Sequence, residues 1–352
     1  MSEEPAAREQ PSRAGVPPAA PPAVRAAIPL RLPFRLPETA ALFGVLIVLL
    51  VFFSITSPFF LRFDNIVNIL QNVAVIGIIA CPATLLLISG QFDLSVGSAA
   101  GFVGMLMAVA AADPQTTTVP FALGLPIWGA LIVALAGAAL VGVINGFAVT
   151  VVGINALITT LGTLAIFRGL TKVLGDGQTI RIHGFGELGV VRPFLDIPLP
   201  VYLFALVVIV FWFIQRYTVY GRSMYAIGAS SVAARLAGIR TKRAIFVGFM
   251  LSSLLVALAG LIRLSQVGGA SVNTGIGFEL AVVTAVVLGG ASLAGGRGTI
   301  LGTIIAVFIV GVLGNGLIQL RVPSFWIEVA GGLLLLGAVA FDQLRIRLAP
   351  ST

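Results

Sequence analysis

Long runs of apolar residues, each close in length to a membrane-spanning helix, dominate this chain of 352 residues. Hydrophobic residues make up 58% of the chain and charged residues only 10%. Because charged residues make up about a quarter of an ordinary globular domain, a chain so poor in charge cannot cover its apolar side chains with polar surface. A helix of about 20 apolar residues crosses a bilayer, and the alternating segments of a membrane barrel do not occur in the sequence. The sequence therefore predicts an all-α polytopic membrane protein.

The apolar runs predict about ten transmembrane helices. We expect these helices at 40–58, 66–89, 95–112, 127–152, 156–174, 199–215, 244–264, 278–293, 299–320 and 324–342. The segment before them, residues 1–38, is rich in Pro, Ala and Arg and lacks periodicity, which is typical of a disordered tail. The predicted organisation is this cytoplasmic tail, a transmembrane domain over 39–343 and a short basic C-terminal tail over 344–352.

The distribution of basic residues predicts which segments face the cytoplasm. With a cytoplasmic N-terminus, five of the 21 basic residues lie in the N-terminal tail, six in the segment 216–243 and three near other inner span ends. Because cytoplasmic loops carry an excess of Lys and Arg, this arrangement favours cytoplasmic N- and C-termini and a cytoplasmic segment 216–243. It also accounts for the net charge of +8 without a nucleic-acid partner.

A basic segment, GRSMYAIGASSVAARLAGIRTKR, lies between two predicted spans and contains five basic residues and no acidic residue. Ser230 or Ser231 can cap a short helix at its start, and Gly238 can end it. Val232 and Leu236 are four residues apart and would share one face of that helix. We therefore predict a short basic helix that a partner protein contacts.

The glycine-rich run GGASLAGGRGT, residues 289–299, resembles a phosphate-binding loop only in its glycine spacing. A P-loop needs Lys and then Ser or Thr after its second glycine, and Gly296 and Arg297 stand at those positions. We expect a tight cytoplasmic turn, with no ATP or other cofactor bound by this chain. The sequence also lacks a catalytic set of residues, and its single histidine, His183, argues against a metal site, so no enzymatic activity is expected.

Several polar residues interrupt the predicted spans. The stretch SGQFDLSVGS, residues 89–98, is either a turn in which Asp93 caps the next helix or a broken helix that lines a translocation route. Asn145 and Asn315 each stand beside a glycine late in a predicted span, which is a weak sign of an internal repeat. Glu279, at the outer start of a predicted span, is either an interfacial residue that reaches water or an external contact or gate residue. We predict a translocation pathway at Gln91, Asp93, Ser95, Asn145 and Asn315.

Five stretches carry a resemblance to a known family. They are SGQFDLSVGS (89–98), INGFAVTVVGINALITTLGTLAIFRGL (144–170), GRSMYAIGASSVAARLAGI (221–239), GIGFELAVVTAVVLGGASLAGGRGTILGT (275–303) and LGNGL (313–317). In this order they are similar to the permease subunits of bacterial ABC importers for monosaccharides, the ribose/xylose/galactose permease family. Two departures from the family pattern are Ala156-Leu157, where Pro-Phe is usual, and Ser230, where Asn is usual. Neither departure points to a particular sugar.

The resemblance implies the permease subunit of an ATP-driven importer for a monosaccharide or similar small polyol, in the cytoplasmic (inner) membrane of a bacterium. It implies three protein partners: a second permease copy (identical or a close paralogue), a cytoplasmic ATPase that binds the ATP, and an extracytoplasmic sugar-binding protein. The residues expected to couple to the ATPase are Arg222, Tyr225, Arg235, Leu236, Gly238 and Arg240. Two alternatives stay open: a related permease for a nucleoside, an amino acid or a furanone signal, and a stand-alone secondary sugar carrier.

Overall fold

The computed structural model describes residues 38–115, 117, 119–182 and 184–348. The predicted N-terminal tail up to residue 37 and His183 lie outside the described residues. The helices are α1 (Glu38–Thr56), α2 (Phe63–Ile88), α3 (Val96–Ala111), α4 (Ile127–Phe147), α5 (Ala156–Leu174), α6 (Glu187–Val190), α7 (Leu199–Tyr217), α8 (Val219–Ala229), α9 (Ser231–Leu236), α10 (Thr241–Val267), α11 (Phe278–Leu288), α12 (Ile300–Gln319) and α13 (Ser324–Leu348). A π-helical turn, η1 (Ala148–Val152), continues α4, and two short strands, β1 (Ile180–Arg181) and β2 (Gly269–Ala270), pair antiparallel.

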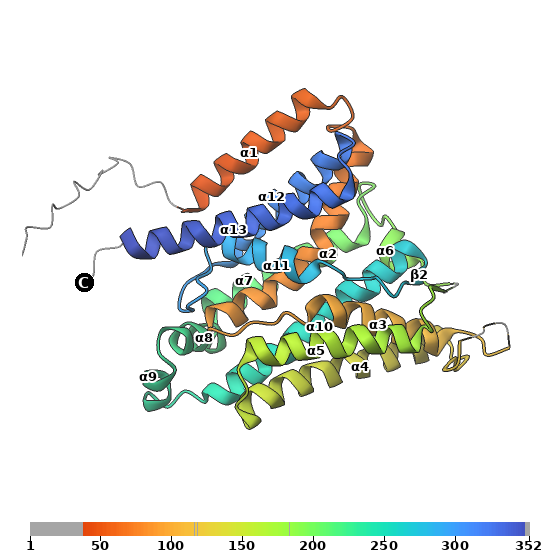
Figure 1. The fold of residues 1–352 in the computed structure, drawn as a ribbon, viewed down its shortest axis with the longest axis horizontal. Helices are drawn as coiled ribbons and strands as arrows, with labels where there is room; N and C mark the ends of the chain where they lie inside the picture. Colours follow the sequence, from red (N-terminus) through yellow and green to blue (C-terminus); the bar gives the residue numbers. More distant parts are fainter. Residues whose placement is uncertain (1–37, 116, 118, 183, 349–352) are drawn as a thin grey trace, which may run out of the picture. The chain divides into compact units, whose positions relative to one another are not determined.

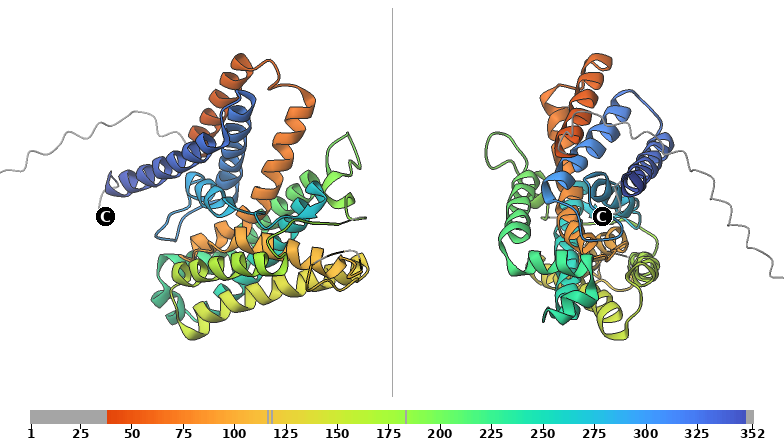
Figure 2. Two further views of the ribbon diagram at one scale, coloured as in Figure 1. Left: turned by 45° about the vertical axis from the view of Figure 1, so that its right-hand side comes forward. Right: turned by 90° about the vertical axis from the view of Figure 1, so that its left-hand side faces the viewer.

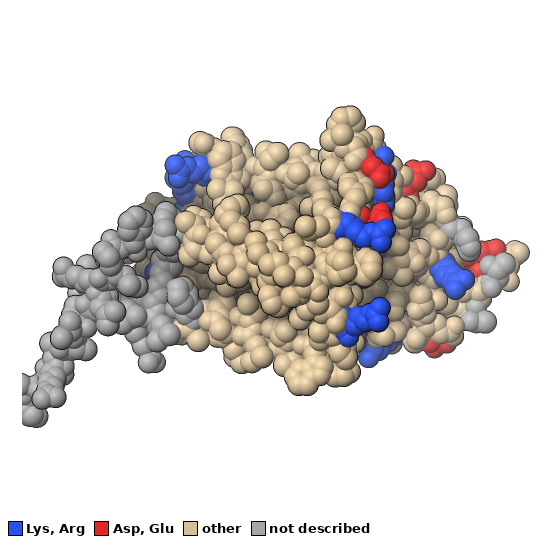
Figure 3. Space-filling view, turned by 90° about the horizontal axis from the view of Figure 1, so that it is seen from above, with Lys and Arg blue, Asp and Glu red and all other residues tan. Residues whose placement is uncertain are grey.

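Each predicted span coincides with a helix. Among the described residues, seven helices are long and apolar enough to cross a membrane, by length and composition: α1, α2, α4 with η1, α5, α7, α10 and α12. The helices α3 and α11, and the apolar part of α13 (Ser324–Ala340), are shorter. Figure 3 shows a broad uncharged surface on one face, with acidic and basic side chains gathered at the right-hand end of the view. The chain is an all-α multi-pass membrane protein, and the count of ten spans stays a prediction.

Two groups of four helices, α2–α5 and α10–α13, interlock through their first members (Figures 1 and 2). The helix α10 packs against α3 and α4, and α2 packs in the corresponding way against α11 and α12. In addition, α2 and α10 contact each other. Small residues permit the closest approaches: Gly260 of α10 lies against the backbone of Ala100 in α3, where a side chain would collide. The main core therefore forms where the two groups interlock.

Two non-helical linkers enter this core. Residues 89–95 connect α2 to α3, and residues 268–277 connect α10 to α11. The 11 residues of α11 rise about 16 Å, roughly half the thickness of a bilayer core. Ser252, the twelfth of the 27 residues of α10, donates a hydrogen bond to Asp93 in the first linker. Since α10 is long enough to span, the start of α3 lies near the middle of the spanning helices.

The basic segment folds as two consecutive helices, α8 and α9 (Figure 1). Ser230 caps α9, because its Oγ accepts a hydrogen bond from the backbone N–H of Ala233 at 3.2 Å. Gly238 follows α9 with φ of +83°, a left-handed conformation that glycine adopts without strain. The short capped helix is confirmed, and the structure adds α8 before it.

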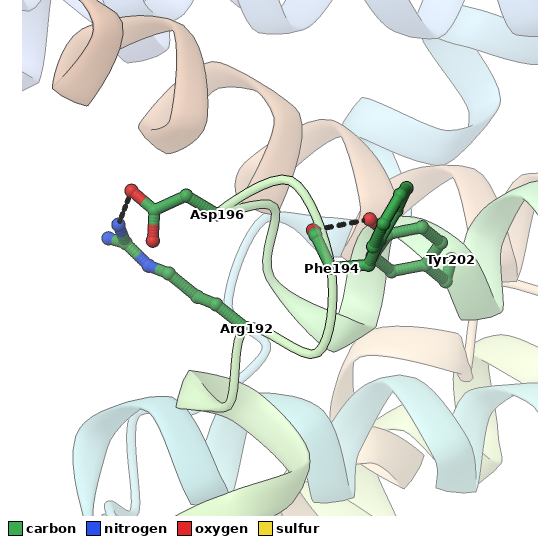
Figure 4. A network of polar contacts seen from close by, with 4 residues as sticks. All are labelled: Arg192, Phe194, Asp196 and Tyr202. Carbon is green, nitrogen blue, oxygen red and sulfur yellow. Dashed lines mark hydrogen bonds and ion pairs between the residues drawn. The ribbon is translucent and has the colours of Figure 1, made fainter.

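The turn between α6 and α7 is held by its own polar contacts (Figure 4). The guanidinium of Arg192 pairs with the carboxylate of Asp196 at 3.0 Å, and the Tyr202 hydroxyl donates to the carbonyl of Phe194 at 2.6 Å. Because both charged groups are exposed, the ion pair contributes only about 0–1 kcal/mol. The Tyr202 hydrogen bond is exposed as well, so both contacts shape the turn at the surface.

Replacing Ser230 tests the cap of α9. In Ser230→Ala the amide of Ala233 loses its acceptor, and we expect helix stability to fall by about 1 kcal/mol. Hydrogen exchange of the peptide that covers residues 231–237 should become faster in this variant. Ser230→Asn should keep the slow exchange, because Asn caps as well as Ser. Ser223→Ala, which removes a hydroxyl bonded within α8, serves as control, and equal exchange in all three variants contradicts the assignment.

Candidate translocation site

A buried hydrogen-bond network surrounds Asp93 in the α2–α3 linker. Its Oδ1 accepts from the backbone N–H of Ser95 at 3.1 Å and from the Ser95 hydroxyl at 2.6 Å. Its Oδ2 accepts from the hydroxyl of Ser252 at 2.8 Å. The helix α3 begins at Val96, and the Asp93 carboxylate closes the turn that precedes this helix. The N-cap position of α3 is Ser95, so Asp93 closes the turn two residues before the cap and also bonds across to α10.

The network continues from Ser95 to two further helices. The Ser95 hydroxyl accepts from the side-chain amide of Asn145 on α4 at 2.9 Å, and the Thr163 hydroxyl on α5 donates to the Asn145 carbonyl oxygen at 2.8 Å. The structure thus joins three predicted pathway residues, Asp93, Ser95 and Asn145. Ser252 and Thr163 complete the set and were missed, because a hydroxyl in a span most often bonds its own helix backbone. In the described part of the chain, no Lys or Arg side chain pairs with Asp93.

Asn315 belongs to a different cluster. Its side-chain amide exchanges two hydrogen bonds with that of Asn65, each at 2.9 Å, and Gln319 donates to Asn65 at 2.6 Å. These amides join α12 to the start of α2. The structure therefore does not bring Asn315 together with Asp93, although Asn145 and Asn315 lie late in corresponding helices.

A cavity of about 730 Å³ lies between the α2–α3 linker and the basic segment. Gln91 and Phe92 line it from the linker, and the turn between η1 and α5 lines it at Asn155. Arg235 of α9 and Lys242 of α10 also line it, and both are exposed. A predicted pathway residue, Gln91, and a predicted coupling residue, Arg235, therefore face one cavity.

A much smaller space of about 20 Å³ lies on the other side of Phe92. The α2–α3 linker forms one wall of this space, and α11 forms the other through Val282, Val283 and Val286. Gln91 and Phe92 line both this space and the large cavity. The α2–α3 linker thus lies between the large cavity and a nearly closed contact with the three valines of α11.

Glu279 lies where the second linker meets the first turn of α3. The carbonyl of Thr274 lies against Gly101, and both the carbonyl of Gly275 and the Glu279 carboxylate lie against Gly97. The linker 268–277 therefore runs along α3 toward its start. The sequence placed Glu279 at the outer start of a span, and the structure places it beside the start of α3, because this ten-residue linker precedes α11.

Tyr225 connects α8 to the glycine-rich turn before α12. Its hydroxyl donates to the carbonyl of Gly298 at 2.6 Å and accepts from the amide of Gln215 at 2.8 Å. The Gln215 carbonyl oxygen accepts from the backbone N–H of Ile300 at 3.1 Å. Burial raises the pKa of Tyr225, so the hydroxyl keeps the proton that it donates. Tyr225 is thus directed into the chain, and the run 289–299 provides the acceptor.

The backbone of α8 also touches the end of α2. At Gly228 any side chain would collide with the carbonyl of Ile88 and the backbone N–H of Gly296. These two groups form a hydrogen bond of 2.7 Å. Three segments that are distant in the sequence, the ends of α2 and α8 and the turn before α12, therefore meet at one backbone junction.

The outer face of α8 and α9 carries the other predicted coupling residues. Arg222, Arg235 and Arg240 are exposed, and Leu236 is 86% exposed. Val232 shares this apolar face and is 57% exposed. Leu236, an exposed apolar residue near exposed arginines on a short capped helix, is suited to contact a protein partner.

These features define a multi-pass membrane permease with a broken-helix polar centre. Residues 65–339 match the family described as "Branched-chain amino acid transport system / permease component", and the chain belongs to this family. The ribose import permease protein RbsC of Escherichia coli (strain K12) is 35% identical over 85% of this chain and 92% of its own length. RbsC of Bacillus subtilis (strain 168) is 38% identical over 85% of this chain and 91% of its own length. The L-arabinose transport system permease protein AraH of Escherichia coli (strain K12) is 36% identical over 86% of this chain and 90% of its own length. No solved structure matches the chain.

Two adjacent serines of α10 test the Asp93 network. Ser252→Ala removes a donor from a buried carboxylate, and we expect the unfolding free energy to fall by about 1–3 kcal/mol. Ser253→Ala is the matched control, because its buried hydroxyl bonds the carbonyl of Met250 in its own helix at 3.0 Å. Thermal unfolding of the purified proteins in one detergent measures the difference. Equal melting temperatures for the two variants contradict the network's role.

Proposed function

We propose that this chain is the membrane subunit of an ATP-driven importer that moves a monosaccharide, ribose-like or xylose-like, across the cytoplasmic membrane of a bacterium. The observation that carries this proposal is the similarity to ribose and L-arabinose permeases over most of both chains. The amide of Gln91, which lines the 730 Å³ cavity, supports it, because an amide can both donate to and accept from a neutral hydroxylated solute.

The working transporter then contains two permease copies, a cytoplasmic ATPase and an external sugar-binding protein. Each permease has ten spans and cytoplasmic termini, which places α8 and α9 on the side of the ATPase. The exposed arginines and Leu236 support this orientation, since they give the ATPase a basic rim and an apolar centre to bind. The absence of a P-loop in the sequence is consistent with ATP binding by the partner.

In the proposed mechanism, closure of the ATPase dimer displaces α9 and α8. The displacement reaches the turn before α12 through Tyr225 and the end of α2 through Gly228. The linker 89–95 and the valines of α11 then separate at Phe92, and the sugar passes from the centre of the chain to the 730 Å³ cavity. Selectivity lies mainly in the external binding protein, because the polar groups in the pathway are few.

Reconstitution tests the proposed function. We expect liposomes that contain the permease, its ATPase and its binding protein to accumulate D-ribose or L-arabinose only when ATP is supplied to the ATPase side. Uptake by the permease alone, driven by an ion gradient, would show a secondary carrier. Thermal-shift screening of the binding protein against pentoses, hexoses, nucleosides and amino acids identifies the cargo, and stabilisation by amino acids alone would overturn the sugar assignment.

Charge reversal on α9 tests the coupling surface. The double variant Arg235→Glu and Leu236→Asp places acidic groups where the ATPase is proposed to bind, so we expect co-purification of the ATPase to fall at least tenfold, as the loss of a central contact would cause. Arg192→Glu reverses a charge in the turn between α6 and α7 and should leave co-purification unchanged. Normal co-purification and sugar-stimulated hydrolysis in the double variant would rule out this surface.

A further inference from the structure

The carboxylate of Glu279 is left without adequate partners. Its Oε2 is buried and makes no hydrogen bond, and its Oε1 accepts only a long bond of 3.4 Å from the backbone N–H of Gly277. No Lys or Arg of the described residues pairs with it. The Oε2 atom lies against Gly97 of α3, and an unsatisfied buried carboxylate oxygen is destabilising, so the side chain gains by turning toward a ligand that donates hydrogen bonds.

Glu279 borders a cavity of about 410 Å³ between α11, α12 and α13. Thr284 on α11 and Glu328 on α13 also line this cavity. Part of the wall is bare backbone at Gly331 and Gly332, and a side chain added at either position would meet nothing within 4 Å. These two glycines are therefore not required for close packing, and their effect is to leave the cavity open.

The polar side chains of the cavity all offer acceptors. The carboxylates of Glu279 and Glu328 accept only, when ionised. The Thr284 hydroxyl donates its proton to the carbonyl of Leu280 at 2.7 Å, which leaves its oxygen as an acceptor. Such a site repels anions and matches a neutral ligand with several hydroxyl donors, while the apolar side chains of the wall, such as Leu313, can pack on its C–H faces.

We propose that this cavity is a sugar-binding subsite within the permease, in which Glu279 accepts hydrogen bonds from the sugar hydroxyls. The subsite rests on the proposed function and adds to it a specific contact in the membrane. Glu279 then contributes to selectivity after the binding protein has released its cargo.

Binding to the permease–ATPase complex, without the binding protein, tests the contact. Saturation-transfer NMR titrations measure the affinity for D-ribose and for its monodeoxy analogues. The wild type should bind at least one deoxy analogue about tenfold more weakly than D-ribose, because the analogue lacks a hydroxyl that donates to a charged group. Glu279→Gln should bind the parent more weakly and lose the discrimination against that analogue. Glu187→Gln, an exposed matched control on α6, should behave as the wild type.

Glycine replacements test the cavity independently. Gly331→Ala and Gly332→Ala place methyl groups in the cavity without a collision, so the protein should remain folded while sugar affinity falls. Gly337→Ala, on the same helix and away from this cavity, should leave affinity unchanged. The subsite is overturned if Glu279→Gln still discriminates against the deoxy analogue, or if the binding signal depends on the monovalent cation in the buffer rather than on the sugar. In either case, ATP-driven sugar transport by the wild type would still support the proposed function. Absence of any sugar transport by the wild type overturns both.

Discussion

The structure depends on how two non-helical linkers satisfy their polar groups inside a membrane bundle. Backbone N–H and C=O groups cannot face lipid, so an irregular segment at this depth must be enclosed by protein or border a cavity. The linker 89–95 meets this requirement through Asp93, whose carboxylate binds the backbone of Ser95 and the side chain of Ser252. The linker 268–277 meets it in part through Arg168, which donates to the carbonyl of Thr274 at 3.0 Å. The interlocked packing of α2 and α10 is what encloses both.

Apart from Asp93, this polar centre consists of neutral hydroxyl and amide side chains. Hydrogen bonds from the Ser95 backbone N–H and from the Ser95 and Ser252 hydroxyls offset part of the cost of burying the Asp93 carboxyl group. Asn145 is central because its amide both donates to Ser95 and accepts from Thr163, so it joins α4 to the α2–α3 linker and to α5. The Asn65, Asn315 and Gln319 cluster uses the same chemistry to join α2 and α12.

Sequence reasoning succeeded where structure is determined locally. Apolar runs located the long helices. The Ser230 cap and the Gly238 end of α9 were also predictable, because each residue acts on the helix turn next to it. It failed where partners are distant: Ser252 lies 159 residues from Asp93, and no local pattern marks its hydroxyl as different from that of Ser253. The contact of Glu279 with α3 was not foreseen, because the packing of the ten-residue linker 268–277 along α3 leaves no local pattern in the sequence.

The junction at Gly228 determines where a displacement of α8 must act. The Ile88 carbonyl is bonded to the N–H of Gly296, and opening that bond inside the protein would leave both groups unsatisfied, which opposes separation of the end of α2 from the turn before α12. Two positions after Ile88, Gly90 has φ of +78°, a left-handed conformation that glycine adopts without strain, and its N–H bonds the carbonyl of Leu87 at 2.8 Å, so the chain turns there out of α2. Because Gly90 is followed directly by Gln91 and Phe92, the proposed route takes a displacement of α8 to the residues that line both cavities.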